Sequence, residues 1–102
     1  MDGAISSHRE NIAALCRRFG VQRLDLFGSA AMGNFDPSCS DFDFLVDLGE
    51  QPSADYVDAY FGLLESLEQL LGRPVDLVTL RSVTNPYLRK SILQSRLPLY
   101  AA

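Results

Sequence analysis

The chain has 102 residues, of which 47% are hydrophobic and 22% charged, and its formal net charge is −4. These values fit one soluble domain over residues 1–102, and the acidic balance disfavours a nucleic-acid substrate because it offers no basic surface for the phosphates. Two cysteines are too few for a disulfide framework, and no apolar run reaches the roughly 18 residues that span a bilayer. We therefore expect a cytoplasmic protein without membrane contact.

The first half of the chain predicts a helix, two strands and a polar loop between the strands. Ser6 or Ser7 is expected to cap a helix that runs to about Phe19, and residues 21–27 are apolar enough for a strand in which Asp25 faces solvent. Residues 42–48 alternate strictly, which predicts a second strand with two chemically different faces. One face carries Phe42, Phe44, Val46 and Leu48, and the other carries Asp41, Asp43, Leu45 and Asp47.

The second half predicts a long helix, a strand and a final helix. Apolar residues recur at helical spacing over residues 55–71, and residues 75–80 form an apolar run typical of a strand. Pro86 is a suitable first residue for a helix that reaches about residue 94. Residues 97–100 are expected to add a short strand or to pack as a tail, and Tyr87 and Leu88 are expected either in a partner surface or in the core.

Three acids and a glycine-serine pair are the candidate site. Asp41 and Asp43 lie about 7 Å apart at the backbone on one strand face, and such close carboxylates favour a shared cation, above all Mg²⁺ with a substrate phosphate. Gly28 allows the backbone to approach a ligand, and Ser29 adds a donor for phosphate oxygens. Asp76 interrupts an apolar run that predicts burial, so pairing or metal binding is expected for it as well.

These residues resemble the nucleotidyltransferase superfamily that includes DNA polymerase beta. Its signature is an apolar residue and Gly-Ser, about a dozen residues, and then Asp-apolar-Asp-apolar, followed by a third acid. The matching positions are Gly28 and Ser29, Asp41 and Asp43, and Asp76. In size and element order the whole chain is similar to the minimal nucleotidyltransferases of prokaryotes, many of which are antitoxins paired with an HEPN-domain toxin.

The resemblance implies an α/β (α+β) nucleotidyltransferase fold, in which a small mixed sheet is flanked by about four helices. It also implies Mg²⁺, as two ions, and ATP as substrate. Gly28 and Ser29 would contact the triphosphate, and all three acids, Asp41, Asp43 and Asp76, would be catalytic metal ligands. The implied reaction transfers AMP to a tyrosine hydroxyl of a partner HEPN toxin (AMPylation). Whether the chain forms a homo- or hetero-oligomer stays open.

Two alternatives and one departure from the family pattern stay open at this point. The chain is either an enzyme or an idle antitoxin that neutralises its toxin by binding alone. Transfer to an aminoglycoside or another small molecule fits the same motif, but no residues remain here for the additional domain that usually holds such an acceptor. Met32 stands where the family usually has an arginine, which removes a cation beside the triphosphate.

Overall fold

The computed structural model describes residues 7–28 and 42–102. Within these ranges no helix is long and apolar enough to cross a membrane. The helices and strands are, in chain order, α2 (Arg9–Arg18), β1 (Arg23–Phe27), β2 (Phe42–Asp47), α3 (Ser53–Leu71), β3 (Val75–Thr79), the 3-10 turn η1 (Leu80–Ser82), α4 (Pro86–Ser95) and β4 (Leu97–Ala101).

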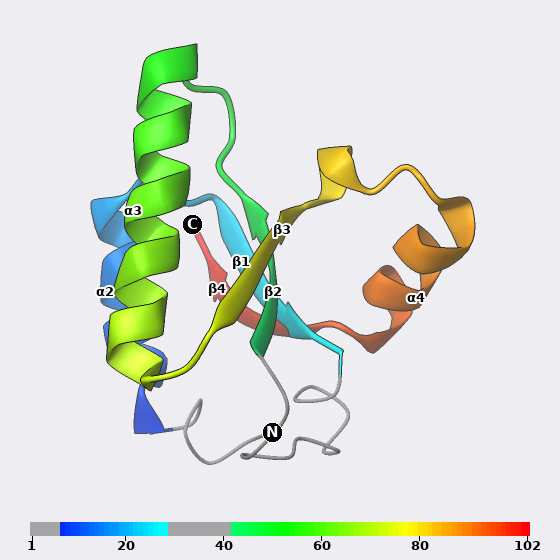
Figure 1. The fold of residues 1–102 in the computed structure, drawn as a ribbon, viewed down its shortest axis with the longest axis horizontal. Coiled ribbons are helices and arrows are strands. Elements are labelled where there is room, and N and C mark those ends of the chain that lie inside the picture. The colour runs from blue at the N-terminus through cyan, green and yellow to red at the C-terminus, as the bar shows by residue number, and fades with distance from the viewer. Residues whose placement is uncertain (1–6, 29–41) are drawn as a thin grey trace.

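The four strands form one mixed sheet in the order β3-β2-β1-β4 (Figure 1). β1 lies in the middle and pairs antiparallel with both β2 and β4, whereas β2 and β3 are parallel. Helices α2 and α3 lie together on one side of the sheet, and α4 lies on the other (Figure 1). The parallel pair requires a crossover connection, and α3 supplies it. The predicted mixed sheet with flanking helices is therefore confirmed.

Most element boundaries follow the sequence signals, with one exception at the first helix. Helix α2 begins at Arg9 with His8 as its N-cap residue, so Ser7 does not cap it, and Ser6 lies outside the described residues. Helix α4 begins at Pro86 as predicted, because the Asn85 side chain accepts hydrogen bonds from the first free backbone N–H groups. Residues 97–101 form a strand rather than a loose tail.

Each face of the sheet buries its own apolar cluster. The larger cluster lies between the sheet and helices α2 and α3, and it contains the alternating residues Phe42, Phe44 and Val46 of β2. The smaller cluster lies on the α4 side, where Leu45 packs with Val83 and Ile92. Because both faces of β2 are covered, its side chains cannot exchange faces without exposing one of the two clusters.

Asp25 is the one charged residue among the buried side chains of the described chain, which corrects the expectation that it faces solvent. It is 1% exposed, and both of its carboxylate oxygens accept a hydrogen bond from Nε of Arg23, at 3.1 and 3.0 Å. Arg96, just after α4, adds a contact at 3.4 Å. A buried carboxylate needs such partners, and this one ties the central strand to the segment that joins α4 and β4.

Removing both arginines tests this ion cluster. The double substitution Arg23→Ala/Arg96→Ala is expected to lower the free energy of unfolding by about 3–5 kcal/mol, because the carboxylate stays buried without a cation. Urea denaturation measures the change. Either single substitution leaves one arginine in place and is expected to cost less than the double one. A loss below about 1 kcal/mol in the double variant would contradict this role.

Cys16 is a buried, fully enclosed thiol in α2. Burial raises the pKa of Cys16 from 9.0 to about 12, although the nearby Arg17 cation acts in the opposite direction. With Cys39→Ser as background, we expect Cys16 to react at pH 8 about 1,000-fold more slowly in the folded protein than in urea. The stability that comes from keeping this thiol neutral is present below pH 9.0 and is lost as the pH rises through about 12. Equal rates in the two states would contradict the burial.

Candidate functional site

Asp43 and Asp76 lie directly opposite each other on the parallel strands β2 and β3. Neighbouring strands are about 4.8 Å apart and partners in register point to the same side, so the two side chains share the α4 face of the sheet. Asp76 is exposed, which corrects the prediction that its apolar neighbours bury it. Its proximity to a second carboxylate, rather than burial, is therefore the reason to expect a cation at this position.

Gly28 brings the end of β1 to the same place. Phe27 pairs with Asp43, and Gly28 follows with φ of +74°, a conformation that favours glycine. A Cβ atom at Gly28 would lie 2.5 Å from Oδ2 of Asp43, so a side chain there would collide with the carboxylate. The predicted glycine thus gives the backbone close access to the acid. All three residues lie at the same end of the sheet, where β1 ends and where β2 and β3 begin.

Asp41 and Ser29 lie outside the described residues, so the structure brings together three of the five predicted site residues. Among residues 7–28 and 42–102, no group of three or more His, Cys, Asp or Glu side chains lies close enough to hold a metal ion. Asp43 and Asp76 supply two oxygen-rich ligands of the kind that Mg²⁺ prefers. The two carboxylates that the structure describes therefore fit such an ion as part of its ligand set.

Packing on the opposite face of the sheet fixes where the two acids lie. Phe42 and Phe44 flank Asp43 in sequence and are both fully buried against the helices, with ring centroids 6.3 Å apart. Leu77 follows Asp76 and is buried in the same cluster. Because neighbouring strand residues point to opposite faces, burial of these apolar side chains directs the acids outward on the α4 side.

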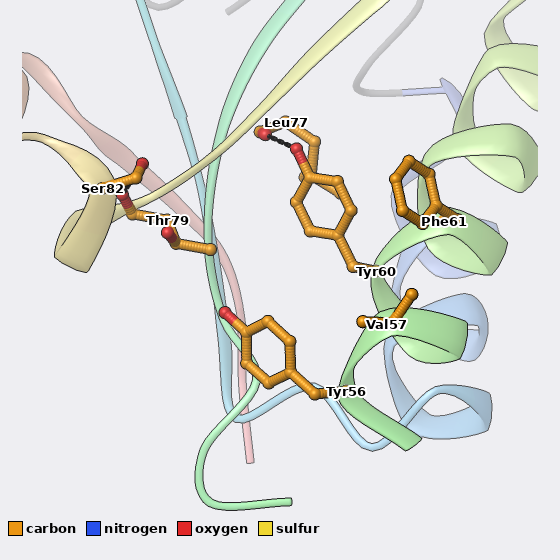
Figure 2. A pocket seen from close by; sticks show the side chains of 7 residues that line it. All are labelled: Tyr56, Val57, Tyr60, Phe61, Leu77, Thr79 and Ser82. Atoms are coloured by element: carbon orange, nitrogen blue, oxygen red, sulfur yellow. Dashed lines mark hydrogen bonds between the residues drawn. The ribbon is translucent and has the colours of Figure 1, made fainter. Parts of the chain in front are cut away.

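An apolar pocket of 280 Å³ lies between α3 and the edge strand β3 (Figure 2). Tyr56 and Tyr60 project into it from α3, and Leu77 and Thr79 line it from β3. Both tyrosines belong to the residues that recur at helical spacing over residues 55–71, a pattern that predicts core packing and no further role. On the opposite side, Tyr87 and Leu88 of α4 are exposed at 85% and 52%, which excludes a core position for both.

The family model for the nucleotidyltransferase domain matches residues 8–99. The chain therefore belongs to the nucleotidyltransferase domain family. The resemblance in the Gly-Ser and Asp-x-Asp motifs extends over the whole described fold, which includes the parallel pairing that carries the two acids.

Three known proteins place the chain more closely within this family. The protein adenylyltransferase MntA of Thermococcus cleftensis is 34% identical over 94 residues, which are 92% of this chain and 87% of the relative. A solved structure described as a candidate minimal nucleotidyltransferase has a TM-score of 0.72 and 36% identity, and the match covers 97% of both chains. A chain in a toxin-antitoxin structure with AMP-PNP has a TM-score of 0.69 and 27% identity, covering 92% of this chain and 73% of that one.

Substitution of Gly28 tests the close approach to Asp43, and Gly72 provides the control. Gly72 ends α3 with a similar φ of +66°, but nothing lies within 4 Å of a Cβ there. We expect Gly72→Ala to cost about 1–2 kcal/mol of stability from backbone strain alone. Gly28→Ala is expected to cost slightly more in urea denaturation, because Oδ2 of Asp43 must also rotate away from the new methyl group. Equal losses in both variants would contradict the contact.

Proposed function

We propose that this chain is a metal-dependent nucleotidyltransferase that transfers AMP from ATP to a tyrosine hydroxyl of a partner HEPN-type toxin and thereby acts as an antitoxin. The observation that carries the proposal is the placement of Asp43 opposite Asp76, with the Gly28 backbone against Asp43. Two similar proteins support the finer points. One bears the name protein adenylyltransferase, and the other was solved within a toxin-antitoxin complex with AMP-PNP.

The two described acids are well placed to hold Mg²⁺. Asp43 and Asp76 would be ligands, and Asp41 would add a third carboxylate from the residue that precedes β2. A bound divalent ion supplies charge neutralisation at the phosphates and activation of the attacking hydroxyl. Such a cation would also offset the repulsion between these carboxylates and the anionic triphosphate.

The chain's own residues would orient the reactants. The Gly28 amide and the Ser29 side chain lie in sequence at the end of β1, where they would donate hydrogen bonds to phosphate oxygens. Asp76, which is exposed, would accept the proton of the attacking tyrosine hydroxyl as it forms a bond to the α-phosphorus. The bond from that phosphorus to the bridging oxygen breaks, and pyrophosphate leaves. Positioning and charge stabilisation account for most of the rate in reactions of this type.

Label transfer from α-labelled ATP tests the proposal. The assay incubates this chain with an HEPN-domain toxin as acceptor, together with labelled ATP and Mg²⁺. We expect Asp41→Asn, Asp43→Asn and Asp76→Asn each to reduce labelling about 100-fold or more, and EDTA to abolish it. Labelling should map to a tyrosine of the acceptor.

Asp47→Asn is the matched control for these substitutions. Asp47 is an exposed carboxylate on β2 that faces the same side as Asp43, and its Oδ1 accepts a hydrogen bond from the Gly49 N–H at 2.8 Å. An asparagine retains this acceptor, so labelling should stay within about twofold of the unmodified chain. Unchanged labelling in the variants of the three acids would refute the proposed chemistry. Full neutralisation of the toxin by a variant that lacks all three acids would instead favour an antitoxin that acts by binding alone.

A further inference from the structure

Strand β3 carries Asp76 but lies at the edge of the sheet, with β2 as its only strand neighbour in the described chain. Edge segments with few backbone partners open more readily than central strands. Asp76 is also the second residue of this strand, close to its N-terminal end. The position of Asp76 relative to Asp43 therefore depends on what holds β3 on its other side.

Two side chains of α3 bind the backbone on either side of Asp76. The Tyr60 hydroxyl donates a hydrogen bond to the carbonyl oxygen of Leu77 (Figure 2), and the Val75 N–H donates to Oε2 of Glu68 at 3.2 Å. Tyr60 and Glu68 are both half-buried, so these bonds are partly shielded from water. The acid is thus held between two anchor points that come from a single helix.

The anchors act against a repulsive pair. Like charges directly opposite each other on neighbouring strands are destabilising, and Asp43 faces Asp76 in this way. Without a cation between them, the repulsion favours movement of the edge strand, because β2 is covered on both faces. Burial raises the pKa of Tyr60, and the nearby Asp76 carboxylate and, to a smaller extent, Tyr56 raise it further. The Tyr60 hydroxyl therefore stays protonated and continues to donate its hydrogen bond.

We propose that Tyr60 and Glu68 are positioning residues for nucleotidyl transfer, which hold β3 so that Asp76 stays opposite Asp43 and the two can share a metal ion. The part of this inference that concerns catalysis rests on the proposed function. Its structural part, that the two side chains restrain the edge strand, is independent of any reaction. The two parts are tested separately below.

Tyr60→Phe keeps the ring and removes only the donor. In the metal-free full chain, hydrogen exchange at the amides of residues 75–78 is expected to become about 3- to 10-fold faster, since one restraint on the strand is lost. Affinity for Mn²⁺ in the presence of AMP-PNP, measured by titration calorimetry, is expected to fall by a similar factor. The transfer rate should fall at low Mg²⁺ and recover at saturating Mg²⁺, because added metal draws the two acids together.

Tyr56→Phe is the matched control for this substitution. Tyr56 projects from the same helix into the same pocket (Figure 2), and its hydroxyl has no hydrogen-bond partner among the described residues. Exchange at residues 75–78 and Mn²⁺ affinity should stay within about twofold of the unmodified chain. Urea denaturation of both variants shows that each is folded under the conditions of the assays.

Two substitutions at Glu68 provide a second test, one that keeps the hydrogen-bond acceptor and one that removes it. Glu68→Gln retains an oxygen that can accept from the Val75 N–H and should behave nearly as the unmodified chain, whereas Glu68→Ala should mimic Tyr60→Phe. Glu65→Ala, at an exposed position of the same helix, should change neither exchange nor affinity.

The outcomes separate this inference from the proposed function. If exchange at residues 75–78 is the same in Tyr60→Phe and Tyr56→Phe, the restraint does not exist and the inference is wrong. A rate that falls equally at all Mg²⁺ concentrations would also overturn it, because repositioning by metal would then have no effect. If the unmodified chain binds no metal with nucleotide, the proposed function fails, while the exchange comparison still decides whether the edge strand is restrained.

Discussion

The parallel register between β2 and β3 is the constraint on which the rest of the site depends. It places two carboxylates opposite each other on one face, which is electrostatically unfavourable in the absence of a cation. The sheet tolerates this arrangement because the alternate residues of the same strands are buried against α2 and α3. Apolar packing on one face therefore maintains a like-charge pair on the other, and the two carboxylates are oxygen ligands of the kind that a divalent ion prefers.

A second register, on the other side of β2, positions β1, the strand between β2 and β4. Its antiparallel pairing with β2 brings Phe27 opposite Asp43, so the chain reaches the acid just where it leaves the sheet at Gly28. The left-handed conformation of Gly28 and the absence of a Cβ allow the backbone to pass within contact distance of the carboxylate. The glycine and the two acids thus meet because the end of β1 and the beginnings of β2 and β3 lie at the same end of the sheet.

The fold and the described acids were predictable because they depend on local patterns. Strict alternation over residues 42–48 assigned Phe42 and Asp43 to opposite faces, and the structure agrees. The burial of Asp25 was not predictable in the same way, because its local partner Arg23 does not by itself indicate burial and its second partner, Arg96, lies 71 residues away. The exposure of Asp76 was missed because an apolar run predicts burial. Asp76 lies on an edge strand, however, and the side chains of an edge strand are only partly covered by neighbours.

The role inferred for Tyr60 also lay beyond sequence analysis, for a related reason. Its spacing within residues 55–71 is that of a core residue, and it does pack against the larger cluster. Only the return of the chain along β3 brings the Leu77 carbonyl within reach of the hydroxyl. A periodic pattern predicts which face of the helix a side chain occupies. It does not predict which backbone group the hydroxyl of that side chain contacts.

Both outer strands of this sheet carry features that oppose association between copies. On β3, the carbonyl oxygens of Leu77 and Thr79 already accept hydrogen bonds from Tyr60 and Ser82, so an incoming strand would have to displace those side chains. On β4, Pro98 has no N–H to offer. Exposed edge strands are common starting points for fibrous aggregation. The side-chain hydrogen bonds on β3 and the proline in β4 disfavour such aggregation while the protein remains folded.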